Sequence, residues 1–115
     1  MHEVSLVEAL FDQTDRAIAP RAPAAVRKVT VRIGELAGVD EQLFRTAFDG
    51  CKTDRGYERA SLEILAEAAV WICGACSGVV TAGRALRCAV CDGTARLDGG
   101  GELILQRLEL EVNDV

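Results

Sequence analysis

Apolar and polar residues alternate along the chain with two different periods. Residues 4–18 and the segment after Asp40 carry apolar side chains every three or four positions, which predicts two amphipathic helices. Asp40 is a suitable N-cap for the second helix. Strict alternation predicts three half-buried strands, at 26–33, 61–66 and 103–112. We therefore expect an α+β fold, with two helices on a small three-stranded sheet.

Each predicted element has one face that we assign to the core. On the helices, the inward residues are Val4, Val7, Leu10, Phe11, Ala17 and Ile18, then Leu43, Phe44, Ala47, Phe48 and Cys51. On the strands they are Val29, Val31 and Ile33, then Leu62, Ile64 and Ala66, then Ile104, Gln106, Leu108, Leu110 and Val112. Gln106 is the polar exception in this set and is expected near the sheet edge. Cys51 is interpreted as a small core residue without chemistry, because buried cysteine is common.

The segment between the second and third strands has a different composition. Residues 73–101 are rich in glycine and contain four of the five cysteines. Few large apolar side chains occur there, so the segment cannot bury enough surface to fold by itself. We predict an inserted module over 71–101, and a main domain formed by 1–70 together with 102–115.

The four cysteines of this module have the spacing of a zinc ribbon. Cys73, Cys76, Cys88 and Cys91 read C-x2-C-x11-C-x2-C, and two such turns can direct four sulfurs at one Zn(II) ion. Four protein ligands leave no open position, so the predicted zinc is structural and contributes to folding. Iron held by the same sulfurs and four free thiols are the alternatives.

Neighbouring residues have expected supporting roles in this module. Gly74, Gly78 and Gly93 would let backbone N–H groups approach the sulfurs. Arg84 and Arg87 lie between the cysteine pairs, where they would offset the negative charge of the thiolates or simply be solvated.

Composition excludes several classes of function. The chain has 115 residues, with 13 basic and 18 acidic side chains, a formal net charge of −5 and 4% aromatic residues. These values argue against binding nucleic acid or anionic lipid through charge. No apolar run is long enough for a membrane helix, and no targeting segment is evident, so we expect a cytoplasmic protein. His2 is the only histidine, which excludes a catalytic triad with an internal histidine base.

The first three residues form a candidate second metal site. The α-amine of Met1 and the amide and imidazole nitrogens of His2 can bind one metal ion together. Glu3 can add a fourth donor through its amide or its carboxylate. Nitrogen and oxygen donors near one plane suit Ni(II) or Cu(II) better than zinc.

Several segments of the chain together form a specific pattern: MHEVSL at the start, IGELAGVD at 33–40, LFRTAFD at 43–49, ASLEI at 60–64, and the cysteine pairs followed by GGELILQRLELE. In these segments the chain resembles the HypA/HybF family of hydrogenase maturation factors over nearly its full length. The resemblance implies a nickel-binding α+β domain with an inserted zinc ribbon. It implies that nickel, as cargo, is held by Met1, His2 and Glu3 and that zinc is held by the four cysteines named above.

The resemblance also implies partners and leaves alternatives. It implies a HypB-type GTPase and the large subunit of [NiFe]-hydrogenase as partners, with urease as a second recipient in some organisms. We expect a nickel metallochaperone and not an enzyme, as a monomer or weak homodimer. A zinc-ribbon adaptor without a second metal is the alternative, and a CxxC thiol-redox enzyme is a less favoured third hypothesis because paired CxxC turns form a closed metal site.

The chain departs from the family pattern in two places. The second cysteine pair commonly reads CPxCG, whereas here the residues are Cys88-Ala89-Val90-Cys91-Asp92-Gly93, which we expect to loosen this turn. Histidines additional to His2, found in some relatives, are absent from this chain.

Overall fold

The computed structural model describes residues 2–81 and 86–111. The helices are α1 (His2–Ile18) and α2 (Glu41–Cys51), with a short 3-10 helix at Pro23–Ala25. The strands are β1 (Val26–Gly34), β2 (Ser61–Glu67), β3 (Val70–Cys73), β4 (Val79–Val80), β5 (Ala95–Gly99) and β6 (Leu103–Leu110). The chain forms two compact units: Met1–Arg32 with Val39–Leu65 and Ile104–Val115, and Ile33–Gly38 with Ala66–Leu103.

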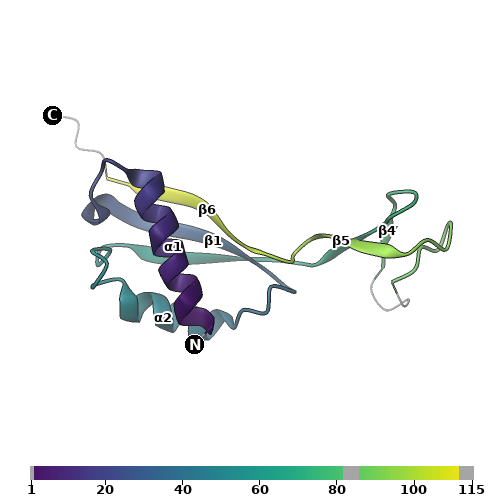
Figure 1. Ribbon diagram of the computed structural model, residues 1–115, viewed down its shortest axis with the longest axis horizontal. Helices are drawn as coiled ribbons and strands as arrows, with labels where there is room; N and C mark the ends of the chain where they lie inside the picture. Colours follow the sequence, from purple (N-terminus) through teal and green to yellow (C-terminus); the bar gives the residue numbers. More distant parts are fainter. Residues whose placement is uncertain (1, 82–85, 112–115) are drawn as a thin grey trace. The chain divides into compact units, whose positions relative to one another are not determined.

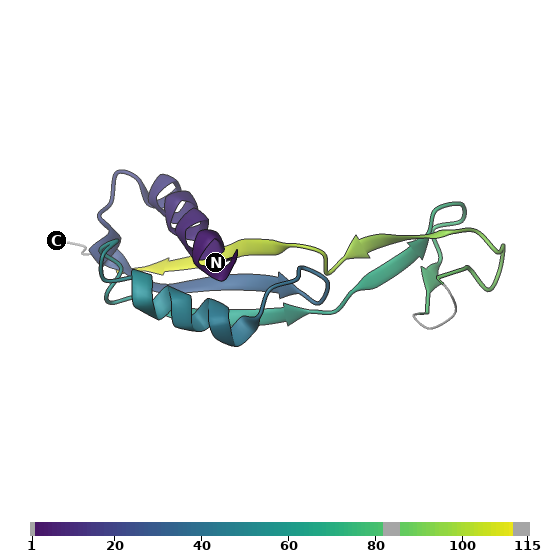
Figure 2. The ribbon, with the colours of Figure 1, turned by 60° about the horizontal axis from the view of Figure 1, so that its bottom comes forward.

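The first sheet has the strand order β2-β1-β6, and helices α1 and α2 lie beside it (Figure 1). The arrows of β1 and β2 run in the same direction, and β6 runs the opposite way (Figure 2). Antiparallel pairing of β1 and β6 agrees with two hydrogen bonds, from the Gly34 N–H to the Glu102 carbonyl and from the Glu111 N–H to the Ala25 carbonyl. The predicted α+β fold of two helices and a three-stranded sheet is confirmed.

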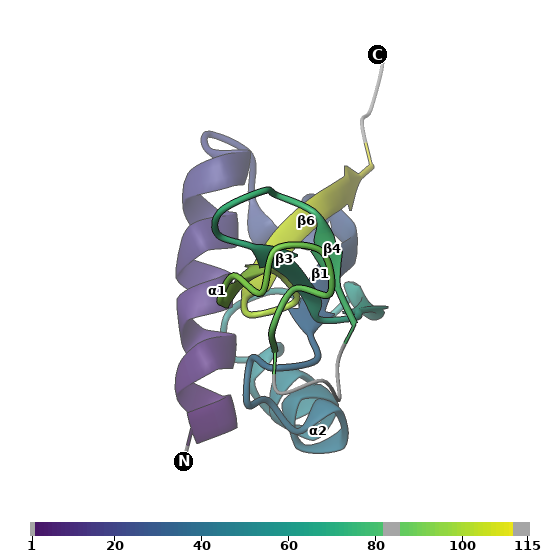
Figure 3. The ribbon, with the colours of Figure 1, turned by 90° about the vertical axis from the view of Figure 1, so that its right-hand side faces the viewer.

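Aromatic and branched side chains form the core between the helices and β1. Val29 and Val31 are fully buried, and the Phe11 ring of α1 stacks on Phe48 of α2 with centroids 5.1 Å apart. Figure 3 shows α1 along its length and α2 nearly down its axis, so the two helices cross each other. The Asp40 carboxylate caps α2 by accepting the Leu43 N–H at 3.0 Å, as predicted.

Several predicted core positions are wrong. Ala17 is exposed, whereas Thr14 is buried on the inner face of α1. The Thr14 hydroxyl donates to the Leu10 carbonyl at 2.8 Å, and this hydrogen bond makes burial of the polar side chain acceptable. Leu43 is 50% exposed and Ala66 is exposed, because each lies near an end of its element. Gln106 is exposed and not in the core, but its expected place at the sheet edge is confirmed, because it lies on the edge strand β6.

The remaining two predicted core residues to report are Cys51 and Val112. Cys51 is half-buried at the end of α2 and does not lie in the core. Val112 lies outside the described residues.

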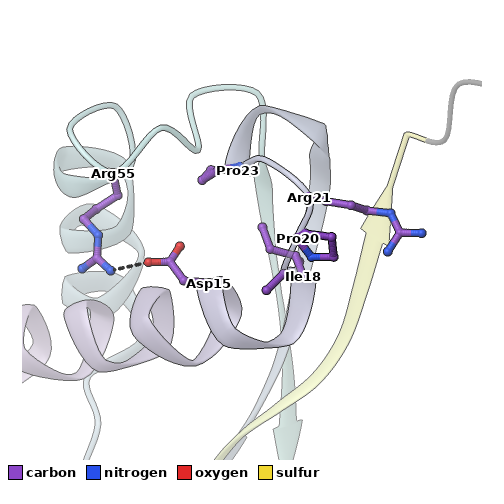
Figure 4. Close-up of a pocket in the computed structure, with 7 residues that line it drawn as sticks. Asp15, Ile18, Pro20, Arg21, Pro23 and Arg55 are labelled. Atoms are coloured by element: carbon purple, nitrogen blue, oxygen red, sulfur yellow. Dashed lines mark hydrogen bonds and ion pairs between the residues drawn. The ribbon is translucent and has the colours of Figure 1, made fainter.

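A polar cluster around Tyr57 holds the end of α1 against the segment that follows α2. The Tyr57 ring is fully buried 4.9 Å from Phe11, and its hydroxyl donates to the Asp15 carboxylate. Arg55 donates to Asp12 at 2.6 Å and to Asp15 at 3.0 Å. Burial and the hydrogen bond to Asp15 raise the pKa of Tyr57, so the phenol stays neutral and donates. Figure 4 shows Arg55 and Asp15 among the residues lining an adjacent pocket of about 290 Å³.

The second unit contains its own sheet, in the order β4-β3-β5. Its strands are antiparallel, with Trp71 opposite both Val80 of β4 and Leu97 of β5. Cys73, Val80 and Cys88 form a small buried cluster, and Trp71 and Ala95 pack against it. So small a core agrees with the prediction that the segment needs additional support to fold. The sequence analysis did not predict these three strands.

Two backbone segments of this unit, at Gly34 and Gly100, approach each other closely. A side chain at Gly34 would place its Cβ 2.2 Å from the carbonyl carbon and oxygen of Gly100. The Leu36 N–H donates to the Gly100 carbonyl at 2.8 Å, and the Glu67 carboxylate accepts the Gly100 N–H at 2.8 Å. Gly100 itself has a φ of +85°, which an L side chain rarely adopts. The contact therefore requires glycine at both positions.

In the part of the chain that the structure describes, no helix has the length and apolar character needed to cross a bilayer.

Candidate metal centre

Two turns with matching hydrogen bonds present the four cysteines. The N–H of Cys73 donates to the Gly78 carbonyl at 2.8 Å, and the N–H of Cys88 donates to the Gly93 carbonyl at 2.9 Å. The residue after each CxxC closes the turn in the same way: Ser77 donates to the Cys73 carbonyl and Asp92 to the Cys88 carbonyl, at 2.9 and 3.0 Å. The two turns are therefore equivalent in their backbone geometry.

The turns bring four sulfur atoms to one point. All four lie within 4.8 Å of one another, with Cys73 Sγ 3.3 Å from Cys91 Sγ and Cys76 Sγ 3.7 Å from Cys88 Sγ. A disulfide would need about 2.05 Å, so these are free thiols. Ligands of a tetrahedral zinc ion with bonds of about 2.3 Å are about 3.8 Å apart. The cluster therefore fits the geometry of a zinc ribbon.

Backbone N–H groups around the cluster favour thiolate at its buried members. Cys76 and Ala75 direct their N–H groups at Cys73 Sγ, which lowers the pKa of Cys73 to about 6. The N–H groups of Cys91 and Val90 lower the pKa of Cys88 in the same way.

The same sulfur contacts oppose ionisation of Cys91. Its hydrogen bond with Cys73 Sγ, 3.3 Å away, raises the pKa of Cys91 to about 12. Four thiolates this close repel one another strongly, and a divalent cation at their centre would remove that repulsion. The donor set and its spacing thus suit a bound metal better than a group of free thiols.

The expected loosening of the second turn is not observed. Asp92 itself takes the left-handed conformation, with φ of +57°, and Ser77 does the same in the first turn with +63°. Gly93 has a separate role, because a Cβ there would lie 2.6 Å from Cys73 Sγ. Of the other two glycines, Gly78 faces Cys76 Sγ at ordinary contact distance, whereas Gly74 faces the Thr94 carbonyl and no sulfur.

Adjacent substitutions should separate these two roles. Gly93→Ala should destabilise the ribbon by about 2 kcal/mol, because its methyl group would overlap the Cys73 sulfur. Asp92→Gly should be neutral or stabilise it by up to about 1 kcal/mol, because glycine adopts a positive φ without strain. Zinc-chelator competition and thermal melting followed by the fluorescence of Trp71 would measure both. Equal behaviour of the two variants would contradict the assignment.

Arg87 contacts the second cysteine turn. Arg87 donates to the Asp92 carbonyl at 3.1 Å and lies 4.0 Å from its carboxylate. These contacts are with the second turn and not with a sulfur. Arg84 lies outside the described residues.

The N-terminal residues form a second candidate site, of which the structure describes two members. His2 is exposed and is the first residue of α1, so the expectation that it precedes the helix is wrong. The Glu3 carboxylate accepts the Asp40 N–H at 3.4 Å, which links the start of α1 to the N-cap of α2. Met1 lies outside the described residues. Sequence reasoning missed the Glu3–Asp40 contact, because no local pattern relates residues so far apart.

A groove lies beside this terminus. It has a volume of about 320 Å³ and is lined by Glu3, Val4, Leu43, Thr46, Ala47, Gly50 and Cys51. Cys51 therefore borders an open groove and is not packed on all sides. Among residues 2–81 and 86–111, the four ribbon cysteines are the one group of three or more close potential metal ligands.

The fold and the cysteine cluster define a small α+β metal-binding protein with a four-cysteine ribbon. Residues 1–110 match the family model described as "Hydrogenase/urease nickel incorporation, metallochaperone, hypA". The hydrogenase maturation factor HypA of Shewanella baltica is 32% identical over 116 residues, covering 99% of both chains. That of Wolinella succinogenes is 33% identical over 118 residues, covering 99% of this chain and 98% of the relative.

Solved structures agree with the sequence comparison. The solution structure of the Ni metallochaperone HypA from Helicobacter pylori superposes with a TM-score of 0.69 and 26% identity, covering 96% of this chain and 98% of that one. A second HypA solution structure gives a TM-score of 0.77 with 28% identity, covering 96% and 97% of the two chains. The chain belongs to the HypA family of nickel metallochaperones for hydrogenase maturation.

Proposed function

We propose that this protein binds Ni(II) through Met1, His2 and Glu3 and delivers it during maturation of [NiFe]-hydrogenase. The observation that carries the proposal is the family match over residues 1–110, which includes the Met-His-Glu start. Nickel is cargo in this function, held by few ligands so that it can be passed on. The partners are a HypB-type GTPase and the hydrogenase large subunit, in the cytoplasm.

The position of His2 and Glu3 at the start of α1 supports this nickel site. The first N–H groups of a helix have no intrahelical acceptor, so the amide nitrogens of His2 and Glu3 are available as ligands. The exposed imidazole of His2 adds a third nitrogen and the α-amine of Met1 a fourth, a set that suits square-planar Ni(II). Because the Glu3 carboxylate accepts the Asp40 N–H, the amide is the favoured donor of Glu3.

The ribbon cysteines have a different task in the proposal. Cys73, Cys76, Cys88 and Cys91 hold a structural Zn(II) ion, a role supported by the spacing of their sulfurs. Four protein ligands leave no position for water or substrate, so the proposed role of this metal is to fold residues 71–101, and the protein is not an enzyme. Residues 1–70 and 102–115 form the nickel-binding domain.

Changes at the terminus should weaken nickel binding and leave zinc in place. His2→Ala removes the imidazole, and adding Gly-Ser before Met1 converts its amine into an amide. We expect each to weaken Ni(II) binding at least about tenfold, equivalent to about 1.4 kcal/mol for one lost ligand. Affinity in the unextended protein should rise with pH, because the metal displaces protons from its ligands. Calorimetry with Ni(II) on zinc-loaded protein measures these effects.

The same Gly-Ser added at the C-terminus is the matched control and should change nothing. If the native protein takes up zinc but no Ni(II), the adaptor hypothesis replaces the metallochaperone. If it takes up Ni(II) equally well with and without the N-terminal extension, the protein still binds nickel but the amine of Met1 is not a ligand.

A further inference from the structure

β6 is an edge strand of the first sheet. β1 pairs with one side of it, and within residues 2–81 and 86–111 no strand pairs with the other. Edge strands present backbone N–H and C=O groups that can pair with a further strand. Gln106 and Arg107, near the middle of β6, are exposed. This edge can therefore accept another strand.

Charges on β6 restrict which strand can be added. Lys28 of β1 lies 3.2 Å from the Glu63 carboxylate of β2 and 3.8 Å from that of Glu109 on β6. Lys28 lowers the pKa of Glu63, and Arg107 adds a weaker effect of the same sign. Arg107 and Glu109 thus share the polar face of the sheet, two residues apart. A strand with the opposite order of charges would complement them.

An antiparallel copy of β6 has that order. We propose that two copies of this chain associate through their β6 edges, with Arg107 of each opposite Glu109 of the other. In this register Leu108 lies opposite itself on the two-fold axis, and Gln106 lies opposite Leu110. The self-complementary pattern of an isologous interface, in which residue i meets j and j meets i, is satisfied.

Neighbouring registers place like charges together. If the axis moves by one residue, either Arg107 faces Arg107 of the second copy or Glu109 faces Glu109. Like charges directly opposite each other destabilise a strand pair. The charge pattern therefore favours one register, and this isologous contact is complete with two copies.

The dimer is expected to be weak and sensitive to salt. Residues 106–110 of each β6 overlap in this register and would pair over about 17 Å, a short contact compared with permanent dimer interfaces. Its ion pairs are exposed, so added salt screens them. Association should therefore depend on concentration, and this proposal does not rest on nickel binding.

Charge reversal and charge exchange test the proposal on the full-length, zinc-loaded chain. Sedimentation velocity would be run across a wide concentration range at low and high salt. Arg107→Glu creates two repulsive pairs and should raise the dissociation constant of the dimer about tenfold or more. The double variant Arg107→Glu with Glu109→Arg restores both ion pairs. Its dimer dissociation constant should therefore be close to that of the unsubstituted chain. Arg59→Glu, an exposed reversal away from β6, is the matched control.

Arg107→Gln, which removes the charge with little effect on folding, should give an intermediate constant, and circular dichroism checks that every variant is folded. A chain that stays monomeric at the highest concentration overturns the proposal. So does a dimer that Arg107→Glu leaves unchanged, or one that the double variant does not restore although it is folded.

Discussion

Cys73→Ser should remove the metal from the ribbon and unfold it, while α1 and α2 remain folded. Structural zinc contributes on the order of 10 kcal/mol to modules of this kind, and the small cluster around Trp71 cannot replace it. The expected loss of ribbon stability is therefore several kcal/mol. Metal analysis would report the zinc content. Fluorescence of Trp71 would report the ribbon, and far-UV circular dichroism would report the helices.

Cys51→Ser is the matched control for this experiment. It changes the same atom in a half-buried cysteine outside the cluster, so it should keep zinc and ribbon fluorescence. Retention of zinc and of Trp71 fluorescence in the Cys73 variant would show that the cysteine cluster is not the metal site.

Gly34→Ala should be the most damaging substitution among the glycines outside the cysteine turns. Its Cβ would lie 2.2 Å from two atoms of the Gly100 backbone, which cannot rotate away as a side chain can. Overpacking of this severity costs about 3 kcal/mol. It would also disturb the nearby hydrogen bond from Leu36 to Gly100. Urea unfolding of the zinc-loaded protein measures the loss.

Gly50→Ala provides a control of opposite sign. Gly50 lies in α2, where nothing is within 4 Å of the position of its Cβ. Alanine there should stabilise the protein by about 0.5–1 kcal/mol, because glycine is the poorer helix former. If both alanine variants changed stability by similar amounts, the tight crossing of Gly34 and Gly100 would be refuted.

The features that the sequence predicted well are those with a local physical cause. Helix periodicity, strand alternation and the N-cap at Asp40 depend on neighbours within a few residues, and each appears at the expected place. The convergence of the four cysteines also followed from their spacing, because CxxC turns orient both sulfurs locally.

The features that were missed depend on contacts between distant segments. Tyr57 stands outside every periodic stretch, yet it is fully buried because Phe11 and Asp15 of α1 accommodate its ring and hydroxyl. Ala17 and Thr14 both fit the helical period, and the hydrogen-bonded hydroxyl of Thr14 made burial of the polar residue acceptable. In the second turn, Asp92 stands where the family pattern has glycine. Glycine often marks a positive φ, so this position could have been predicted to adopt the φ of +57° that Asp92 has.

The order of strands along the chain has a consequence for assembly of the protein. β2 ends at Glu67 and β6 begins at Leu103, so everything between them is a tether that must close before β6 can join the sheet. The entropy of loop closure rises only with the logarithm of loop length. If this segment were fully flexible, the free energy needed to close it would exceed that of a four-residue turn by about 2 kcal/mol. Metal uptake that compacts the tether lowers this cost, so zinc should speed the docking of β6, although the sheet can form without it.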